Sequence, residues 1–270
     1  MTNRPRQLPV HAMMIVLSVL ALFPVYWMIV TALKPETEIF STALWPKAPS
    51  LENFGYVLEA IPMLRILWNT ALMASATAAA QVLTGLLAAY ALVRWPFPGV
   101  KLAQAVIGLS WLVPFQVTMI PNYVLATELG LRDTIAGLVI PNAAAAFAVI
   151  VFYNAMRSFP KEVIEAARMD GAGASRILWQ IVAPNMRPAL AALTVLAFIS
   201  AWNEYFWPLL LTRHIENAVV QIGLEMFMSQ EGNQWGPMMA AATLASLPIL
   251  ALYLVLHRQI IDSFMRSGLK

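Results

Sequence analysis

A single carboxylate lies inside the long apolar stretches of this sequence: Glu204, which follows Trp202 and Asn203 in the run from residue 188 to 212. An acid in a membrane-spanning segment is a candidate functional group because its charge is costly in lipid. These three residues could face a polar solute or a partner subunit, and the carboxylate could bind a coupling proton. An acid near the end of a span can also reach external water or hydrogen-bond within the bundle, and the sequence leaves both interpretations open.

Uncharged amide side chains occur in other apolar runs and could hydrogen-bond a hydroxylated solute. Asn69 and Gln116 are the candidates for such a path, and Gln116 is favoured because two prolines flank it and are expected to kink its helix. Gln81 and Asn142 have the same chemistry in two further runs. Amide side chains more often join membrane helices to one another, so both roles remain open for each residue.

The sequence lacks the motifs of the common catalytic sites. No Gly-x-x-x-x-Gly-Lys-Ser/Thr loop and no Gly-Lys pair occurs, so the chain is not expected to hydrolyse ATP. The His-Glu-x-x-His and Gly-x-Ser-x-Gly patterns are also missing. With no cysteine, disulfides, thiolate metal sites and cysteine nucleophiles are excluded. We therefore expect no catalytic residue, no bound cofactor and no metal in this chain.

The elements that would position these residues are long apolar segments. Of the 270 residues, 60% are hydrophobic and 11% charged, whereas soluble domains have about 25% charged residues. Runs of the roughly 20 residues that a spanning helix needs occupy residues 12–32, 66–93, 102–127, 135–156, 188–212 and 235–256. Because backbone amides in lipid must be satisfied within their own segment, these runs predict helices. We expect an all-α polytopic membrane protein with six transmembrane helices in one domain, residues 1–270.

The positions of Lys and Arg predict the orientation of these helices, because cytoplasmic loops are enriched in both. Of the 17 such residues, five lie on one side: Lys34, Lys47, Arg65, Arg132 and Arg213. The other twelve are Arg4, Arg6, Arg94, Lys101, Arg157, Lys161, Arg168, Arg176, Arg187, Arg258, Arg266 and Lys270. Both termini are therefore expected in the cytoplasm, with the chain in a bacterial-type plasma membrane. The basic residues form no stripe, so nucleic acid is not an expected partner.

The longest cytoplasmic loop, residues 157–187, has the pattern of two short helices. Residues 161–169 contain no helix breaker, the segment from Asp170 to Gly173 ends the first helix, and Ser175 is the expected cap of the second. Val163, Ile164 and Ala167 form an apolar stripe on the first helix. That stripe could rest on the bilayer or beneath its own bundle. That arrangement is the expectation on physical grounds alone. Two glutamates among the polar residues leave a protein partner open as the alternative, since lipid-binding helices are rich in Lys and Arg.

In this loop the sequence resembles the permease subunits of binding-protein-dependent ABC importers, in the carbohydrate branch typified by the maltose-system permeases. The family signature is Glu-Ala-Ala, three residues, Gly, nine residues, Ile, one residue, Leu-Pro. It occurs here as residues 165–167, Gly171, Ile181 and Pro184, with Ala183 in place of the usual Leu. Residues 33–35, 87–91, 120–123 and 201–204 also match the family.

The resemblance implies the type I ABC importer permease fold and assigns the loop helix as a coupling element seated in a cleft of a cytoplasmic ATPase. In that role Glu165 would pair with an ATPase cation, Ala166 and Ala167 would allow close approach, and Gly171, after Asp170, would provide the turn. A bulky or β-branched residue at Gly171 should be poorly tolerated if the backbone there has a positive φ angle. The implied partners are a second homologous permease, two ATPase subunits that bind ATP and Mg²⁺, an external solute-binding protein and membrane lipid.

The implied function is import of a sugar or related polyol through one half of the translocation pathway, by alternating access driven by ATP. A glycerol-3-phosphate importer is the alternative, but no Lys or Arg lies in any span, which favours a neutral solute. A different class of transporter would use Glu204 to bind a coupling ion without an ATPase. The prolines lack the symmetry between halves that such transporters commonly show, so the ABC importer is preferred.

Overall fold

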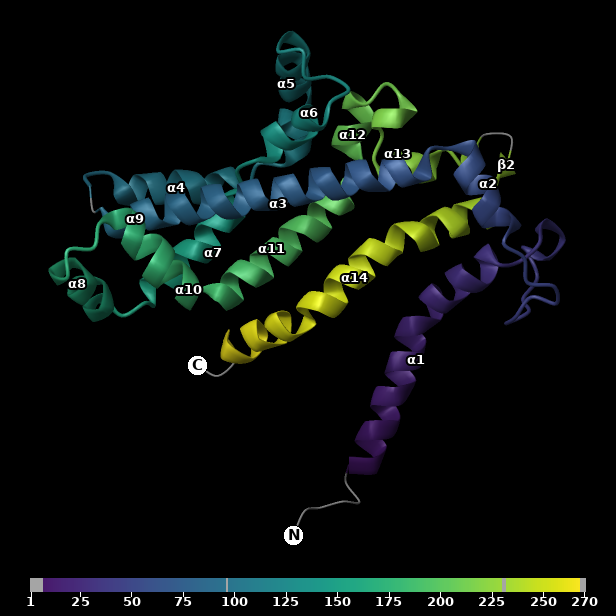
Figure 1. The fold of residues 1–270 in the computed structure, drawn as a ribbon, viewed down its shortest axis with the longest axis horizontal. Helices are drawn as coiled ribbons and strands as arrows, with labels where there is room; N and C mark the ends of the chain where they lie inside the picture. Colours follow the sequence, from purple (N-terminus) through teal and green to yellow (C-terminus); the bar gives the residue numbers. More distant parts are fainter. Residues whose placement is uncertain (1–6, 96, 230–231, 268–270) are drawn as a thin grey trace. The chain divides into compact units, whose positions relative to one another are not determined.

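The computed structural model of the chain describes residues 7–95, 97–229 and 232–267 (Figure 1). The chain forms two compact units, Met1–Leu64 with Ile222–Leu247, and Arg65–Gln221 with Pro248–Lys270. Each is considered separately below. The basic residues at the two chain ends on which the predicted orientation partly rests, Arg4, Arg6 and Lys270, lie outside the described residues.

The first unit contains α1 (Gln7–Ala32), η2 (Glu36–Glu38), α2 (Glu52–Ala60), the strands β1 (Met228–Ser229) and β2 (Gly232–Asn233), and the beginning of α14 (Trp235–Ser267). Helix α13 (Val220–Glu225) enters this unit from the second. The two strands pair antiparallel, with Met228 opposite Asn233, and form the only sheet among the described residues. Apart from this pair the described chain is helical, so the predicted all-α class is confirmed.

The end of α1 is fixed by side-chain hydrogen bonds. A helix leaves its last carbonyl groups without partners in the helix, and here the Asn53 amide donates to the carbonyls of Ala32 (2.9 Å) and Lys34 (2.8 Å). Lys34 itself is fully buried. Its Nζ donates to the Ser41 carbonyl at 2.8 Å and lies 4.3 Å from the centre of the Trp27 ring, so the buried charge has both a polar partner and a cation–π partner.

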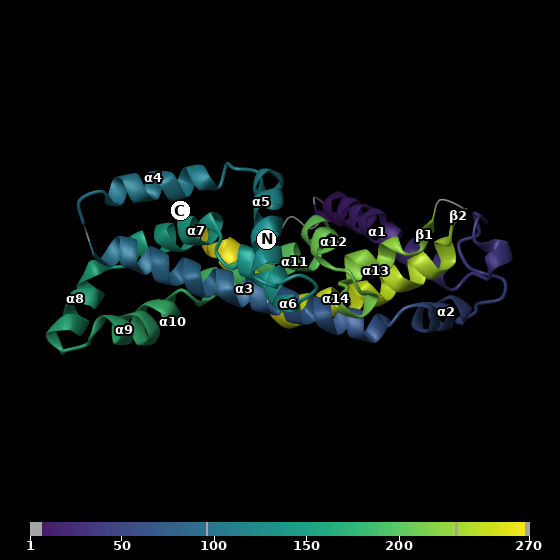
Figure 2. The ribbon, with the colours of Figure 1, turned by 90° about the horizontal axis from the view of Figure 1, so that it is seen from above.

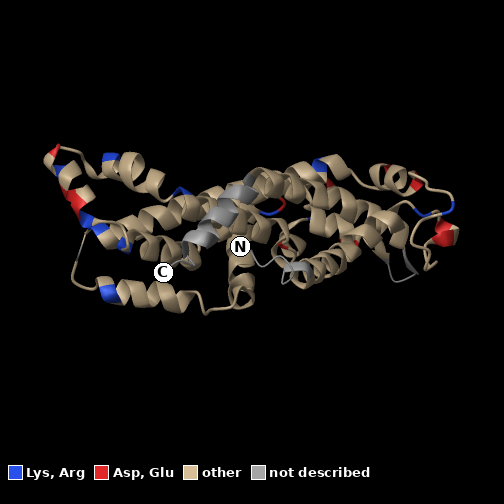
Figure 3. Cartoon of the chain, turned by 90° about the horizontal axis from the view of Figure 1, so that it is seen from below, with Lys and Arg blue, Asp and Glu red and all other residues tan. Residues whose placement is uncertain are grey.

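The second unit is built on the long helix α3 (Met63–Arg94). The elements that follow it are α4 (Val100–Ser110), α5 (Phe115–Glu128), α6 (Ile135–Val139), η3 (Ile140–Asn142), α7 (Ala146–Arg157), α8 (Lys161–Met169), α9 (Ala174–Ile177), the π-helical turn η4 (Leu178–Val182), α10 (Ala183–Asn185), α11 (Arg187–Trp202), α12 (Phe206–Leu211) and η5 (Ile215–Asn217). Helices α8 to α10 lie near the carboxyl end of α3 (Figures 1 and 2). Charged residues lie mainly at helix ends and in connecting segments, and the long helices carry few (Figure 3).

Three helices in the described residues are long and apolar enough to cross a membrane: Pro9–Ala32, Met63–Arg94 and Trp235–Val255. Three more candidate spans are pairs of helices, bent by 93° between α4 and α5, by 49° between Ile135–Asn142 and α7, and by 81° between Ala174–Asn185 and α11. Counting each bent pair as one span gives up to six, the predicted number. The third, fourth and fifth predicted runs are each broken into two helical pieces.

Two of the breaks have a local cause. Pro114 has an extended backbone (ψ 136°) and precedes α5, so the third run breaks before it. In the fifth run, Pro208 has no N–H to give the carbonyl of Glu204. The chain ends α11 at Trp202 and starts α12 at Phe206, which places Pro208 in a first turn, where that N–H is not needed.

Side chains of α3 hold the bend between η3 and α7. Gln81 donates from Nε2 to the carbonyl of Asn142 at 2.9 Å, and the Thr84 hydroxyl donates to the carbonyl of Ala143 at 3.0 Å. Nearby, α3 and α7 approach so closely that a Cβ atom on Gly85 would lie 2.7 Å from the Cβ of Ala148. Small residues permit such close packing between membrane helices.

The main buried cluster of the second unit joins the long apolar helices to the short helices of the loop at residues 157–187. It includes Leu86 and Tyr90 of α3, Phe152 and Met156 of α7, and Ala167 of α8, together with Ile177, Leu178 and Val182. The Tyr90 hydroxyl also donates to the carbonyl of Ala174 at 3.0 Å, at the start of α9. Helix α8 is therefore anchored to α3 and α7 through α9 and η4.

Candidate coupling and translocation sites

Helix α8 has the bounds that the sequence predicted, Lys161–Met169, directly after Pro160. Its carboxyl end is a Schellman motif: the Gly171 N–H donates to the Arg168 carbonyl at 2.9 Å and the Ala172 N–H to the Ala167 carbonyl at 3.0 Å. Gly171 has a φ angle of +78°, so the condition under which a bulky residue there should be poorly tolerated is met. Such a turn is specified by local sequence, which is why it could be predicted.

The start of the second loop helix differs from the prediction. Gly173, with an extended backbone (φ −71°, ψ 166°), directly precedes α9 at Ala174. Ser175 lies inside the helix and makes no cap, so its assignment as the N-cap is wrong. The helix begins earlier because Gly173 can take the extended conformation of a cap residue, and glycine is an accepted residue there.

The apolar stripe of α8 is only partly covered by the chain itself. Ala167 is buried in the main cluster and Ile164 packs against it. Val163 and Met169 remain 44% and 88% exposed, and Ala166 is exposed as well. The helix therefore packs beneath its own bundle along one face and presents a second, partly apolar face that no described residue covers.

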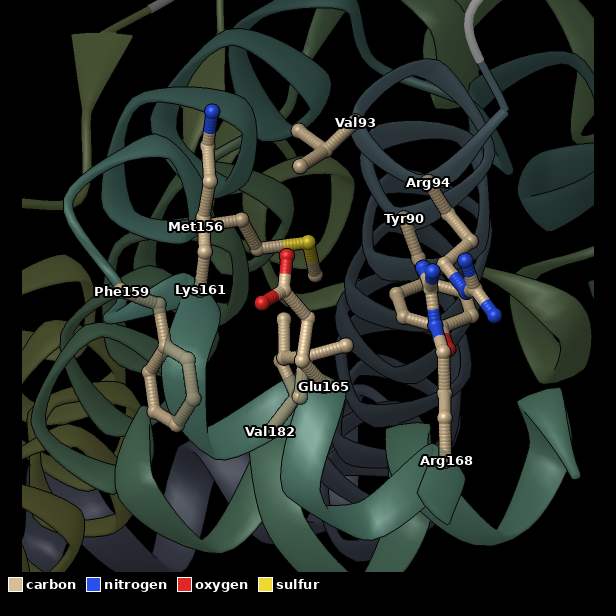
Figure 4. Close-up of a pocket in the computed structure, with 10 residues that line it drawn as sticks. Tyr90, Val93, Arg94, Met156, Phe159, Lys161, Glu165, Arg168 and Val182 are labelled. Atoms are coloured by element: carbon tan, nitrogen blue, oxygen red, sulfur yellow. The ribbon is translucent and has the colours of Figure 1, made fainter. Parts of the chain in front are cut away.

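Behind α8 is a cavity of about 130 Å³ that contains charged side chains from two helices. Arg94 comes from the end of α3, and Lys161, Glu165 and Arg168 come from α8. Arg168 extends toward Arg94 and Tyr90, while the Glu165 carboxylate lies on the opposite side (Figure 4). Glu165 forms no ion pair with any described residue.

A second cavity, of about 60 Å³, lies between the membrane helices of the same unit. Its polar lining comes from Thr77 and Gln81 of α3, Asn142 of η3, Ser200 of α11 and Glu204. It adjoins a groove of about 620 Å³, since Gln81, Ala197 and Ser200 line both, and Trp111 and Ser110 line the groove. These side chains offer hydrogen-bond donors and acceptors next to an aromatic ring.

Glu204 lies in the break between α11 and α12 and lines the smaller cavity. Its Oε1 accepts the backbone N–H of Trp207 at 3.2 Å, so the carboxylate caps α12. The Trp207 indole N–H donates to the Gly137 carbonyl at 3.1 Å. The carboxylate thus has a structural partner and also faces the cavity.

The two residues before Glu204 do not line either cavity. Trp202 is 1% exposed and stacks on Phe198, with ring centres 5.5 Å apart. Asn203 is exposed, donates to the Ile199 carbonyl at 2.9 Å and accepts from Gln221 at 3.3 Å. The structure thus gives both side chains other contacts.

The other two predicted path residues also lie elsewhere. Asn69 donates to the carbonyls of Glu216 (2.9 Å) and Ala218 (3.1 Å), joining α3 to the segment after α12. Gln116 is exposed on α5 and lines neither cavity. Of the five path candidates, the structure brings only Glu204 to the polar cavity.

Ser200 was missing from the predicted path, although the sequence carries a signal for it. Leu193, Ala197, Ser200 and Glu204 are spaced by four, three and four residues, which places them along one side of a helix. A small polar residue one turn before the only acid of the span would have predicted a polar wall. Thr77 carries a similar signal, because it lies one turn before Gln81 on α3. Trp111 has none, because it reaches the groove from the end of another helix.

A separate polar cluster joins the loop after α5 to the loop after α12. Asp133 has a φ angle of +58°. Its carboxylate accepts the backbone N–H groups of Arg213 (2.9 Å) and His214 (3.2 Å), the His214 Nδ1–H (2.6 Å) and the Asn217 amide (3.0 Å). Burial raises the pKa of Asp133, but these hydrogen bonds together lower it well below its usual range. The hydrogen bond to Asp133, followed by its charge, raises the pKa of His214.

We expect Asp133→Ala to lower the free energy of unfolding by about 1–3 kcal/mol, because several donors lose their acceptor. Asp133→Asn should cost less, since asparagine tolerates a positive φ and keeps one acceptor oxygen. The contribution of charged His214 should be full below pH 6.5 and lost as the pH rises through its raised pKa. Thermal unfolding of the detergent-purified chain between pH 5 and 9 measures both effects. A difference between the native chain and His214→Gln that does not shrink as the pH rises would contradict this account.

Comparisons with known proteins agree with the geometry. The family described as "Binding-protein-dependent transport system inner membrane component" matches residues 81–266. The chain is 33% identical over 267 residues, 95% of each chain, to the sn-glycerol-3-phosphate transport system permease protein UgpE of Yersinia enterocolitica. It is 30% identical over 268 residues, again 95% of each chain, to the protein of the same name in Brucella abortus.

Two solved structures share the fold. One is a bacterial ABC transporter involved in the import of the acidic polysaccharide alginate, with a TM-score of 0.82 and 24% identity over 96% of this chain and 99% of that chain. The other is the alginate transporter in complex with an alginate pentasaccharide-bound periplasmic protein, with a TM-score of 0.68 and 15% identity over 96% of both chains. The predicted ABC importer permease fold is confirmed.

Proposed function

Since the chain belongs to the family of binding-protein-dependent transport system inner membrane components, we propose that it forms half of the translocation pathway of an ATP-driven importer for a sugar or related polyol. It is an inner-membrane transport subunit and not an enzyme. Membership of a binding-protein-dependent transport family argues against the alternative of an ion-coupled transporter that uses Glu204. The contact of Glu204 with the Trp207 N–H also gives the carboxylate a role that requires no coupling ion.

The chemistry of the polar cavity supports a neutral solute. Gln81, Asn142, Ser200 and Glu204 provide groups that hydrogen-bond hydroxyls, and no Lys or Arg is among the described residues that line this cavity or the adjoining groove. Trp111 adds an exposed aromatic face in the groove. A negatively charged solute would meet the Glu204 carboxylate without a compensating cation, which opposes its passage.

Glycerol-3-phosphate is the second candidate, because relatives 30–33% identical over 95% of this chain have that transport system in their names. The lining of the two cavities speaks against it. Substrate choice in such systems can change while the permease fold is kept, because function lies in particular sites rather than in the fold.

The proposed assembly contains a second homologous permease, two ATPase subunits that bind ATP and Mg²⁺, and an external solute-binding protein. The solute-binding protein is supported by the family's description and by the alginate transporter, whose solved complex contains a periplasmic protein. The second permease and the two ATPase subunits rest on the family resemblance of the loop at residues 157–187. The exposed face of α8 is the proposed ATPase contact. Ala166 permits close approach there, whereas Ala167, the other residue predicted for this contact, is buried in the main cluster of the chain itself. Gly171 after Asp170 fixes the end of the helix.

Glu165 lies at the edge of this proposed contact. Its carboxylate is exposed but lies on the rim of the cavity behind α8, without an ion-pair partner among the described residues. An ATPase cation would therefore have to enter beside α8 to pair with it. Alternating access then follows if closure of the ATPase dimer moves α8, which is packed against α3 and α7 through the main buried cluster.

Uptake by the whole importer in proteoliposomes tests the proposal. We expect ATP-dependent uptake of labelled neutral sugars or polyols when the binding protein is present, and none of labelled sn-glycerol-3-phosphate. Ser200→Leu should reduce uptake at least about tenfold by filling the polar cavity, whereas Ser200→Ala, the control at the same position, should change it by less than about threefold. Uptake of sn-glycerol-3-phosphate alone would overturn the solute proposal, and uptake without ATP would overturn the ATP-driven mechanism.

A further inference from the structure

The cavity behind α8 contains more positive than negative charge. Arg94, Lys161 and Arg168 line it together with a single carboxylate, that of Glu165. Arg94 and Arg168 converge beside the Tyr90 ring, away from Glu165 (Figure 4). The Nε atom of Arg94 is buried and has no hydrogen-bond partner among the described residues. Two neighbouring guanidinium groups and an unpaired buried donor are groups suited to binding an anion on this side of the cavity.

The opposite wall of the same cavity is apolar. Met156, Phe159, Ile164 and Val182 line it. The volume of about 130 Å³ is several times the roughly 10–15 Å³ that a single water molecule requires, and it can accommodate a phosphate group with the first carbons attached to it. A free phosphate ion would use only the cationic side. An amphipathic phosphodiester would use both walls.

The cavity lies at the end of a candidate membrane span, where lipid headgroups are expected. Arg94 is the last residue of α3, a candidate span, and belongs to the side predicted to be cytoplasmic. Trp95 and Phe97 follow it and are 51% and 46% exposed, as expected of aromatic residues at a membrane interface. Basic pockets between helices on the cytoplasmic side are sites where anionic lipid headgroups bind.

We propose that this cavity binds the phosphodiester group of an anionic phospholipid of the cytoplasmic leaflet, with Arg94 and Arg168 holding the phosphate and the apolar wall contacting the glycerol and first acyl carbons. The lipid would then bridge α3 and α8 and restrain the proposed coupling helix. This inference goes beyond the proposed function, because it involves neither the solute nor ATP.

Native mass spectrometry of the purified importer complex tests the proposal, after incubation with phosphatidylglycerol or phosphatidylcholine. We expect the native chain to retain phosphatidylglycerol and the double variant Arg94→Gln/Arg168→Gln to retain at least tenfold less. Lys101→Gln is the matched control, because Lys101 is an exposed cation of α4 that does not line the cavity. Equal retention of phosphatidylglycerol by the double variant, or of phosphatidylcholine by the native chain, would overturn the proposal.

Two further arms separate the alternatives. Inorganic phosphate should not displace the bound lipid at millimolar concentration; full displacement would assign the arginines to a soluble anion and overturn the lipid. If the double variant does not fold, Arg168→Lys is the variant to use, because it keeps the positive charge but cannot bind phosphate in a bidentate manner. We expect this variant to fold and to retain less lipid than the native chain. Loss of the ATPase from Arg168→Lys with unchanged lipid retention would show that the arginines serve the ATPase, and would overturn the proposal.

Discussion

Replacing Gly171 with valine should separate the chain from the proposed ATPase subunit. Gly171 has a φ angle of +78° and closes the Schellman turn at the end of α8. A residue with a Cβ atom costs roughly 1–2 kcal/mol in this conformation, and a β-branched residue is a genuine outlier there. A change of 2 kcal/mol lowers the population of the native turn about thirtyfold. Because α8 has only nine residues, a displaced end changes much of the face proposed to contact the ATPase.

Affinity purification of the tagged chain with quantitative mass spectrometry of the co-purified ATPase measures this effect. Gly173→Ala is the control, since Gly173 has a negative φ angle and a Cβ atom there would meet nothing within 4 Å. The amount of ATPase recovered with Gly171→Asn should lie between the amounts recovered with Gly171→Val and Gly173→Ala, because asparagine enters the left-handed region more easily. Full recovery of the ATPase with Gly171→Val would remove the turn from the coupling mechanism.

Replacing Gly137 with alanine should prevent the second unit from folding. A Cβ atom there would overlap the carbonyl oxygen of Leu131 and lie 2.7 Å from Cδ2 of Leu211. The backbone cannot move away easily, because the Gly137 N–H donates to the Thr134 hydroxyl at 3.1 Å and its carbonyl accepts the Trp207 indole N–H at 3.1 Å. We expect a cost of about 3 kcal/mol or more, at the upper end for overpacking, since a main-chain atom is involved.

Size-exclusion chromatography of a fluorescent fusion reports the yield of folded chain. Gly108→Ala provides the comparison, because Gly108 lies within α4 and a Cβ atom there would meet nothing within 4 Å. That variant should match the native chain, since alanine also favours the helix. A normal peak for Gly137→Ala would show that α6 and the loop before it are packed less tightly than described.

The features predicted correctly from sequence are those that depend on short stretches of chain. Helix α8 follows from the absence of breakers between Pro160 and Asp170, and the turn at Gly171 follows from the need for positive φ at a helix end. Hydropathy likewise predicted the number of spans. In each case the conformation is determined by neighbouring residues and by the surrounding water or lipid, and contacts with distant parts of the chain are not required.

The lining of the polar cavity could not be predicted in the same way. Gln81 and Asn142 are 61 residues apart and meet only because the span containing Asn142 is bent. Trp202 was predicted to face the path, but packing against the other helices turns it into the core. Which side of a helix faces a cavity depends on packing against other helices, and a single sequence contains that information only indirectly.

The two hydrogen bonds that α3 makes to the bend before α7 also bear on how fast the importer can turn over. Gln81 and Thr84 occupy the carbonyls of Asn142 and Ala143, which a straight helix would give to its own amides. Straightening this span would require both bonds to break before the replacement bonds form. If this span straightens during transport, breaking these two hydrogen bonds sets part of the energy barrier for leaving the bent conformation. Removing either side-chain hydrogen bond should then shorten the time spent in the bent conformation without altering the solute that is carried.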